Sequence, residues 1–304
     1  MTGGRDKYST RDEGMFSPAK DAFVGKQLDH YEVEEKIAEG GLSSVYRATD
    51  VNNRQTVVLK IVHKHLLSSV KNYKKLESKI RALINLSDPH IATYKDVVFV
   101  DGRVVLVLKP LIFESLEDLL SKTGHIGPER AVGIFIQVCQ AMEAASRADI
   151  VHRDIKPSNI IILDNQKFSD DIMVMDFGIA KIIADESEGA KSDQFVTRTR
   201  ETFGSPLYLS PEQCAGKKVD SRSDIYSLGC LMYETLSGNV PIRGASAYET
   251  FRLKFSDAPK PFDETLQVPP WLNDLVLSCL HVDAEQRPSG AKYISHKMSG
   301  YVSR

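Results

Sequence analysis

The chain has 304 residues, of which 42% are hydrophobic and 26% are charged, a composition typical of a globular protein with enough apolar side chains for a core. Its 39 Lys and Arg residues nearly balance its 41 Asp and Glu residues, which excludes a protein held to nucleic acid or anionic lipid by bulk charge. The four cysteines are widely spaced and form no metal-ligand pattern, so we expect buried thiols in a reducing compartment.

Residues 1–25 are predicted to be a disordered tail, because glycine, serine and charged residues dominate them. The tail has no apolar core of the kind found in signal peptides. The longest apolar run, 104–113, is interrupted by Lys109 and is too short to cross a bilayer. We therefore expect a soluble, cytoplasmic protein with no membrane segment in this chain.

The segment after the tail is predicted to form a small antiparallel sheet with one helix. Alternating apolar residues indicate five strands, of which two flank the turn at Gly40-Gly41 and two are joined by a hairpin turn at Asp101-Gly102. The expected elements are strands around 33–37 and 45–46, a strand over 56–62, a helix over 72–86, and strands over 92–100 and 103–109.

Beyond residue 116 the apolar residues recur at helical spacing. Pro128 stands where a helix should begin, and the apolar face of that helix continues to Ala145. Further helices are predicted around 225–232 and 272–279. The expected fold class is therefore α+β, with a small β-rich lobe, a larger helical lobe and a cleft between them.

Carboxylate, lysine and amide side chains gather in two short segments, each reached by an apolar run. The first segment reads HRDIKPSN over 152–159, and the second reads DFG over 176–178. Phosphoryl transfer needs such a set: one carboxylate accepts the proton of the attacking hydroxyl, and a lysine balances the charge on the transferred group. A second carboxylate and an amide oxygen are suitable ligands for Mg²⁺.

These two segments resemble the catalytic and metal-binding loops of eukaryotic-type (Hanks-type) Ser/Thr protein kinases, most closely the bacterial members. The segment FGSPLYLSPEQ over 203–213 resembles the family's peptide-docking segment, and SDIYSLG over 223–229 and Arg287-Pro288 resemble two later structural markers. The similarity covers about 31–297. It implies the bilobal protein-kinase-like fold, with ATP and Mg²⁺ as cofactors and proteins with Ser/Thr acceptors as substrates.

The resemblance also implies the domain boundaries. A kinase domain is expected over 26–304. Its N-lobe is expected over about 26–109, its hinge over about 110–114 and its C-lobe over about 115–304.

Roles carry over position by position from the family. The resemblance implies that Asp154 is the catalytic base, that Lys156 contacts the γ-phosphate, and that Lys60 binds the α- and β-phosphates. It implies that Asn159 and Asp176 are the Mg²⁺ ligands. It also implies that Asn159 is one of the catalytic residues. The full ATP-binding set that it implies is Ile37, Ala38, Glu39, Gly40, Gly41, Leu42, Ser43, Ser44, Val45, Val58, Lys60 and Ile161.

Other motif residues are expected to be structural. Asp224 and the pair Glu212–Arg287 match buried contacts of the family. His152 is expected to be a core histidine packed under Phe177 rather than a proton carrier.

The stretch 181–203 resembles an activation loop. Thr197 and Thr199 precede Gly204 at a spacing similar to that of the autophosphorylated pair in bacterial kinases. We expect phosphate on one of them to order the loop through Arg153.

Two positions depart from the family pattern. In the phosphate-covering loop, Gly40 keeps the middle glycine, while Ala38 and Ser43 replace the other two. In the predicted helix over 72–86, Lys79 stands where active kinases have the glutamate that pairs with the strand lysine. Glu77 is near in sequence, but two residues turn a helix by about 200°, so we expect it to face away unless the helix register shifts.

Three functions therefore stay open. The first is an ATP- and Mg²⁺-dependent serine/threonine kinase that autophosphorylates. The second is a nucleotide-binding pseudokinase scaffold with weak or no catalysis, which Lys79 and the reduced glycine loop would explain. The third is a small-molecule kinase, against which the peptide-docking segment argues. Kinases of this type often activate through dimers, so the resemblance suggests a homodimer, while the sequence leaves the oligomeric state open.

Overall fold

The structure is a computed structural model, and it describes residues 21–41, 43–67, 70, 72–84, 86–110, 113–163, 170–177, 182–183, 206–217 and 219–302. Several residues singled out by the sequence lie outside these ranges, namely Leu42, Gly178, Thr197, Thr199 and Gly204. So do 111–112 of the expected hinge and all of the stretch 181–203 except 182–183.

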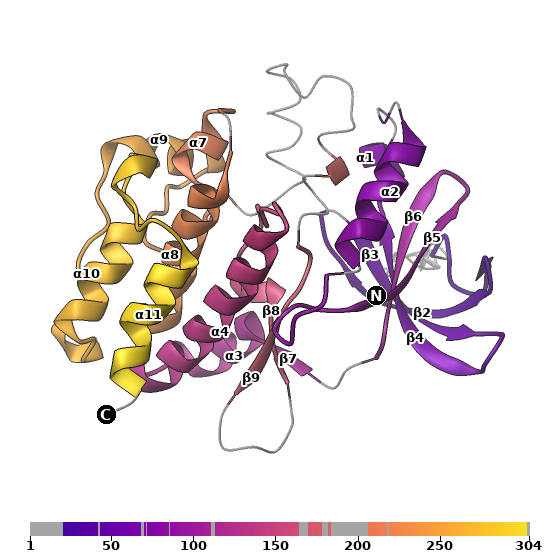
Figure 1. The fold of residues 1–304 in the computed structure, drawn as a ribbon, viewed down its shortest axis with the longest axis horizontal. Helices are drawn as coiled ribbons and strands as arrows, with labels where there is room; N and C mark the ends of the chain where they lie inside the picture. The colour runs from indigo at the N-terminus through magenta and orange to yellow at the C-terminus, as the bar shows by residue number, and fades with distance from the viewer. Residues whose placement is uncertain are drawn as a thin grey trace, which may run out of the picture.

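A curved antiparallel sheet forms the first half of the fold (Figure 1). Its strand order is β1-β2-β3-β4-β6-β5, and every neighbouring pair is antiparallel. The strands are β1 (Gln27–Leu28), β2 (Tyr31–Glu39), β3 (Ser43–Asp50), β4 (Gln55–Val62), β5 (Tyr94–Val100) and β6 (Arg103–Leu108). The five strands expected from alternating hydrophobicity are confirmed, and the short β1 extends the sheet at its edge.

The two faces of the sheet have different partners. On one face Leu59 and Ile61 of β4 pack with Tyr46 in a core of their own. On the other face the sheet is covered by α2 (Tyr73–Ile84), which buries Leu76 and Ile80 completely. Because strand side chains alternate in direction, this division follows directly from the period-two pattern of β4.

The residues just before β1 pack against the outer face of the sheet. The ring of Phe23 meets that of Tyr46 edge-on, with 5.6 Å between the centroids. The backbone N–H of Gly25 donates to the carbonyl oxygen of Val33 at 2.9 Å. Residues 21–25, which the sequence assigned to the tail, therefore have defined contacts with the sheet.

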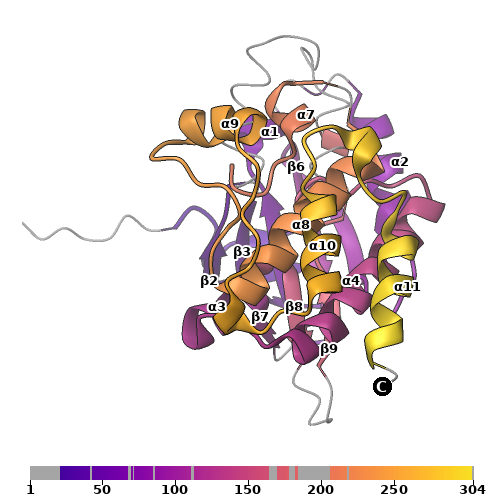
Figure 2. The same ribbon diagram turned by 90° about the vertical axis from the view of Figure 1, so that its left-hand side faces the viewer.

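The second half of the fold is helical, and α4 runs through its core (Figure 1). Pro128 occupies the first turn of α4, where its missing N–H needs no partner. Figure 2 shows α9, α10 and α11 on the side that faces away from the large sheet. The helices of this half are α3 (Leu116–Thr123), α4 (Pro128–Arg147), α7 (Pro211–Cys214), α8 (Ser221–Ser237), α9 (Ala247–Ser256), α10 (Pro270–Cys279) and α11 (Ala291–Val302), and a short α1 (Lys64–Leu67) follows β4.

Gly229 of α8 permits close packing against α10. A Cβ at this position would lie 2.9 Å from the Cβ of Cys279 and 3.0 Å from the Cδ2 of Leu280. Any larger residue would therefore separate the two helices or displace the end of α10.

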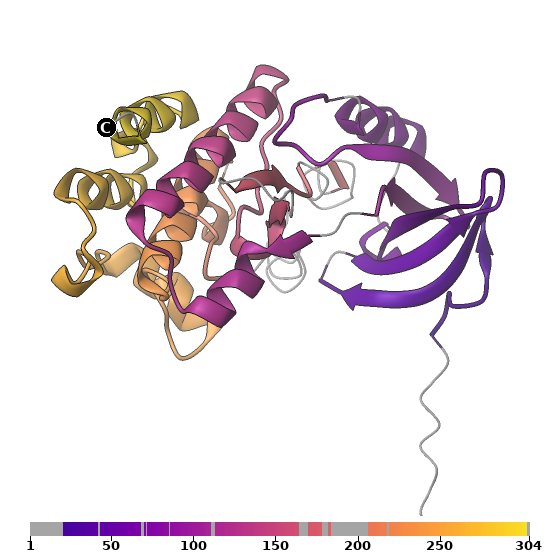
Figure 3. The same ribbon diagram turned by 90° about the horizontal axis from the view of Figure 1, so that it is seen from below.

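A second, three-stranded sheet lies between the large sheet and the helices (Figure 3). It consists of β7 (Phe113–Ser115), β8 (Ile160–Leu163) and β9 (Asp171–Val174), in the order β7-β8-β9. This small sheet carries the two polar segments singled out by the sequence. The first, with the 3-10 helix η1 (Pro157–Asn159), leads into β8, and the second follows β9.

All four cysteines are buried and free, as expected. Burial raises the pKa of Cys230 to about 11 and that of Cys279 to about 12, so both thiols stay protonated and unreactive near neutral pH. Among the described residues, no helix is both long and apolar enough to span a bilayer.

Candidate active site

His152 is the structural anchor of the first polar segment. Its side chain is fully buried, and its ring packs against that of Phe177 with 4.4 Å between the centroids. Nε2 donates to the carbonyl oxygen of Met175 at 2.8 Å, while Nδ1 accepts from the backbone N–H of Asp154 at 3.2 Å. Burial lowers the pKa of His152, which agrees with the neutral tautomer that these two bonds require. The burial and the contact with Phe177 confirm the expectation that His152 is a core histidine.

Asp224 of α8 holds the backbone beside His152. Its Oδ2 accepts from the N–H of His152 at 2.7 Å, and its Oδ1 accepts from the N–H of Arg153 at 2.8 Å. Arg153 has φ +67°, a left-handed conformation that is costly for a residue with a Cβ. The two hydrogen bonds that Asp224 accepts therefore hold the chain in the turn that leads to Asp154.

Asp154 lies in a hydrogen-bonded group with two other candidate residues. Lys156 Nζ lies 2.8 Å from Asp154 Oδ2, and Asn159 Nδ2 donates to the same oxygen at 3.1 Å. Asn159 Nδ2 also donates to the backbone carbonyl of Asp154 at 2.7 Å. Burial raises the pKa of Asp154 and the charge of Asp176 adds to this, although Lys156 and Asn159 oppose the change. The result is a carboxylate that is more basic than an exposed aspartate.

Asp176 follows β9 and has φ +65°. Its carboxylate is mostly buried, with 12% of the side chain exposed, and Oδ2 forms an ion pair with Lys60 of β4. Burial alone would raise the pKa of Asp176, but the charge and hydrogen bond of Lys60 lower it, so the group is ionised. The structure thus brings together Lys60 and Asp176, which lie 116 positions apart in the chain.

Backbone hydrogen bonds connect the two polar segments. The N–H of Met175 donates to the carbonyl oxygen of Asn159 at 2.8 Å, next to the bond from His152 to Met175. The candidate base and the candidate metal ligand therefore sit on one connected backbone framework.

Tyr94 of β5 is a residue of this site that the sequence did not suggest. Its hydroxyl donates to Asp176 Oδ1 at 3.3 Å. Burial first, and then the neighbouring Asp176, raise the pKa of Tyr94 well above 10, so the phenol remains a donor. Nothing in the local sequence of a strand indicates this contact, because it depends on how β5 lies beside the segment after β9.

Glu77 of α2 pairs with a residue of its own helix. Glu77 forms an ion pair with Arg81 on the same helix at 2.9 Å, and Lys60 pairs with Asp176 instead. The expectation that Glu77 faces away from the strand lysine is consistent with this pairing. Lys79 is half-buried on the same helix.

The loop expected to cover the phosphates is a hairpin between β2 and β3. Ala38 pairs with Val45 across the two strands, and the N–H of Gly40 donates to the carbonyl of Ser43 at 2.9 Å. Ser43 and Ser44 are buried, whereas Ile37, Ala38, Glu39, Gly40 and Gly41 are exposed.

The expected nucleotide-contact positions Val45, Val58 and Lys60 on β3 and β4 share one face of the sheet. Val45 lies opposite Lys60 in the β3–β4 register, and Val58 lies opposite Leu108 in the β4–β6 register. Ile161 is buried on β8 of the small sheet.

The peptide-docking segment is held by contacts from α8 and α9. Ser227 Oγ donates to the carbonyl of Tyr208 at 2.9 Å, and the buried Lys254 donates from Nζ to the carbonyl of Leu207 at 2.9 Å. Ser210 and Gln213 form a reciprocal capping box that starts α7, a pattern that the S-x-x-Q spacing could have predicted. No motif in the sequence indicated the contact that Lys254 makes.

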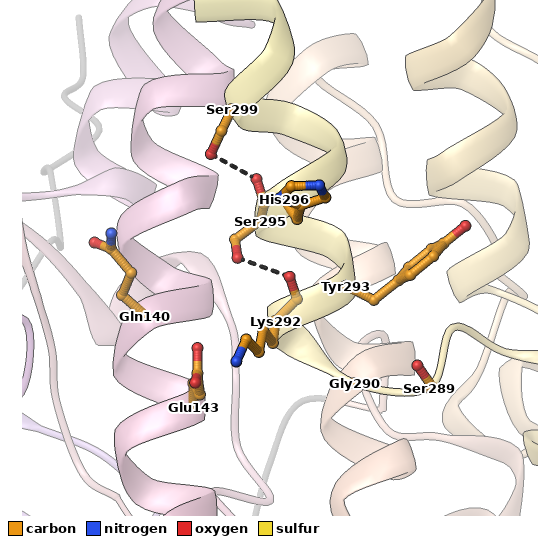
Figure 4. A pocket seen from close by; sticks show the side chains of 9 residues that line it. All are labelled: Gln140, Glu143, Ser289, Gly290, Lys292, Tyr293, Ser295, His296 and Ser299. Atoms are coloured by element: carbon orange, nitrogen blue, oxygen red, sulfur yellow. Dashed lines mark hydrogen bonds between the residues drawn. The ribbon is translucent and has the colours of Figure 1, made fainter.

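A separate cavity of about 610 Å³ lies between α4 and α11 (Figure 4). It contains none of the candidate catalytic residues. Its lining is Gln140, Glu143, Ser289, Gly290, Lys292, Tyr293, Ser295, His296 and Ser299.

The fold and this arrangement of groups are those of a phosphotransferase of the protein kinase type. The chain belongs to the protein kinase domain family, whose model matches residues 31–299.

Named bacterial kinases are similar over most of this chain. The serine/threonine-protein kinase pkn3 of Myxococcus xanthus is 31% identical over 283 residues, which cover 91% of this chain and 51% of that protein. The serine/threonine-protein kinase PknB of Mycolicibacterium smegmatis is 34% identical over 267 residues, which cover 85% of this chain and 41% of that protein. The chain thus spans about half the length of these relatives or less.

Proposed function

We propose that this domain transfers the γ-phosphate of ATP to serine or threonine hydroxyls of protein substrates. The observation that carries the proposal is the hydrogen-bonded group Asp154–Lys156–Asn159, joined through the backbone of Met175 to the Lys60–Asp176 pair. The names of the bacterial relatives support the serine/threonine specificity.

In this proposal Asp154 accepts the proton of the substrate hydroxyl. The hydroxyl oxygen then forms a bond to the γ-phosphorus, while the bond from that phosphorus to the β–γ bridging oxygen breaks and ADP leaves. The raised pKa of Asp154 makes it a better proton acceptor than an ordinary aspartate. Lys156, whose Nζ lies 2.8 Å from Asp154, places a positive charge where the transferred group would pass.

The residues present fit a magnesium ion. Among the described residues, both hydrogen bonds of the Asn159 side chain are made by Nδ2, which leaves its amide oxygen Oδ1 to face a metal together with the ionised Asp176. Among the described residues there is no cluster of three or more His, Cys, Asp or Glu side chains suited to a metal, at this site or at any other. When bound, Mg²⁺ would neutralise charge on the phosphates, and Asn159 and Asp176 are the groups of this chain that would hold it.

We propose that the nucleotide lies against β2, β3 and β4, on the face of the sheet that carries Lys60 and Val58. Lys60 would bind its phosphates, the 37–45 hairpin would cover them, and Val45, Val58 and Ile161 would line the base. The lobes would divide near 110–114, since β6 ends at Leu108 and β7 begins at Phe113.

Autophosphorylation of Thr197 or Thr199 is part of the same proposal. Mass spectrometry after incubation with ATP tests it, and an unmodified segment in an otherwise active enzyme would contradict it.

The substrate class is tested with three peptides that differ only in a Ser, Thr or Tyr acceptor, together with a small-molecule alcohol. Label from γ-labelled ATP is expected on the Ser and Thr peptides. Label on the alcohol alone would favour a small-molecule kinase, and nucleotide binding without any transfer would favour a pseudokinase scaffold.

A further inference from the structure

The carboxylate of Asp176 is held at both of its oxygens by protein side chains. Lys60 of β4 pairs with Oδ2, and the hydroxyl of Tyr94 on β5 donates to Oδ1 at 3.3 Å. Tyr94 is 7% exposed, so its hydroxyl points into the interior toward the site rather than to bulk water. Two strands of the large sheet, β4 and β5, which lie on either side of β6, therefore contact one carboxylate that belongs to the other half of the fold.

The backbone fixes the distance between Tyr94 and Asp176. The N–H of Ala92 donates to the carbonyl of Val174 at 3.0 Å, and the N–H of Val174 donates to the carbonyl of His90 at 2.8 Å. Tyr94 and Asp176 each lie two residues beyond the pair Ala92–Val174. The phenol and the carboxylate thus meet because β9 is bonded to the segment that leads into β5.

Asp176 also needs to be held. Its φ of +65° is unfavourable for a residue other than glycine, and such a conformation persists only where surrounding contacts maintain it. The backbone bond from Met175 to Asn159 fixes one side of this turn, and the contacts of the carboxylate with Lys60 and Tyr94 fix the other.

We propose that Tyr94 is a positioning residue that orients the carboxylate of Asp176 for the metal–nucleotide complex. This inference rests on the proposed function. Lys60 has three N–H groups to divide between Asp176 and nucleotide phosphates, so a bound nucleotide would weaken its hold on the carboxylate. Among the described residues, the hydroxyl of Tyr94 is then the side-chain donor that still holds the carboxylate of Asp176 in place.

The variant Tyr94→Phe tests the proposal, because it removes the hydroxyl and keeps the ring in the core. Two quantities are measured: the affinity for Mn²⁺ by electron paramagnetic resonance in the presence of a non-hydrolysable ATP analogue, and the affinity for a fluorescent ATP analogue in EDTA. We expect the Mn²⁺ affinity to fall about tenfold, the scale of one hydrogen bond to a charged group. Metal-free nucleotide affinity is expected to stay within about twofold, since the hydroxyl contacts the carboxylate and not the nucleotide.

Tyr46→Phe is the matched control. The hydroxyl of Tyr46 also donates to an aspartate at 3.3 Å, that of Asp21, and Tyr46 is also buried in the large sheet, but in the core on its other face. We expect this variant to keep the Mn²⁺ affinity of the wild type. An equal loss in both variants would overturn the proposal, because it would show a general effect on the sheet.

The outcomes also separate this inference from the proposed function. A wild-type protein that binds the metal–nucleotide complex, with an unchanged Mn²⁺ affinity in Tyr94→Phe, would overturn the role of Tyr94 alone. A loss of metal-free nucleotide binding in Tyr94→Phe would overturn it as well, because the hydroxyl would then be structural. A wild-type protein that binds the metal–nucleotide complex and transfers no phosphate would contradict the proposed function and leave the role of Tyr94 to be decided by the binding data.

Discussion

The guanidinium of Arg287 donates two parallel hydrogen bonds to Glu212, from Nη1 to Oε1 at 2.8 Å and from Nη2 to Oε2 at 2.9 Å. Arg287 is buried, and the side chain of Glu212 is 14% exposed. The pair connects α7, at the end of the peptide-docking segment, to the loop before α11. Its buried, structural character was expected from the sequence and is consistent with this geometry.

Removal of the arginine from this pair is expected to destabilise the domain strongly. In Arg287→Met, Glu212 would keep its charge in the interior without its main partner, which costs about 3–5 kcal/mol for a buried pair. Arg222→Met is the matched control, because Arg222 pairs with Asp220 and Glu285 at the surface, where solvent screens the charges and the loss of stability should be much smaller. Urea unfolding measures both. Similar losses in the two variants would contradict the buried role of Arg287.

The same pair predicts a loss of stability in acid. Burial raises the pKa of Glu212, but the hydrogen bonds from Arg287 and Ser223 outweigh it and lower the pKa from 4.5 to about 2. A lowered folded-state pKa stabilises the fold above the unfolded pKa, so the contribution is complete above pH 4.5 and is lost as the pH falls toward 2. It amounts to about 3 kcal/mol. Unfolding free energies measured from pH 6 to pH 3 should fall less steeply in Glu212→Gln, and equal slopes would show that other carboxylates cause the acid loss.

The pKa of Asp154 predicts the acid limb of the pH–rate profile. The base must be ionised, so a pKa raised by burial places the fall in kcat at a higher pH than for an ordinary aspartate. Because Lys156 opposes that rise, Lys156→Met should move the limb to still higher pH, whatever its effect on the maximal rate. Lys122→Met, which removes a lysine that pairs with Glu114 on the surface, should leave the limb in place. An unmoved limb in Lys156→Met would show that another group titrates.

The position of Glu77 predicts that its charge is dispensable for catalysis. Glu77 pairs with Arg81 along α2, and such a pair contributes about 0.3–0.5 kcal/mol to the helix. Glu77→Gln should therefore keep kcat within about twofold, whereas Lys60→Met should abolish transfer. A large loss of activity in Glu77→Gln would mean that α2 turns in the active state and brings Glu77 to Lys60.

Part of this fold could be predicted from the alternation of apolar side chains, which is clearest in β4. Val57, Leu59 and Ile61 bury one face of β4, and Val58 and Lys60 occupy the other, so a pattern of period two was sufficient to place the strand. The helix over 72–86 was also found, although it is shorter in the structure, where it ends at Ile84.

The helices α3, α9 and α11 have sequence patterns that are too weak to predict them. The helix α3 has only eight residues, and α9 exposes the large apolar side chains Tyr248 and Phe255, which weakens any one-sided pattern. The helix α11 depends on its packing against α4, more than 140 positions earlier in the chain, and local periodicity cannot reveal such a partner.

The candidate site likewise has one part that local sequence patterns predict and another part that they do not. The order and spacing of Asp154, Lys156, Asn159 and Asp176 are local patterns, so the sequence alone could propose them. The bond from Tyr94 to Asp176 joins residues 82 positions apart and depends on the pairing of β9 with the segment before β5. No rule of local spacing predicts it.

The most direct test of the account is phosphate transfer from γ-labelled ATP with Mg²⁺, compared between the wild type and Asp154→Asn. Asparagine keeps the shape of the side chain and cannot accept the proton, so the rate should fall by about 10²–10⁴-fold while nucleotide binding is retained. Equal incorporation in the two proteins, or none in a wild type that binds ATP, would contradict the assignment of this chain as an active kinase with Asp154 as its base.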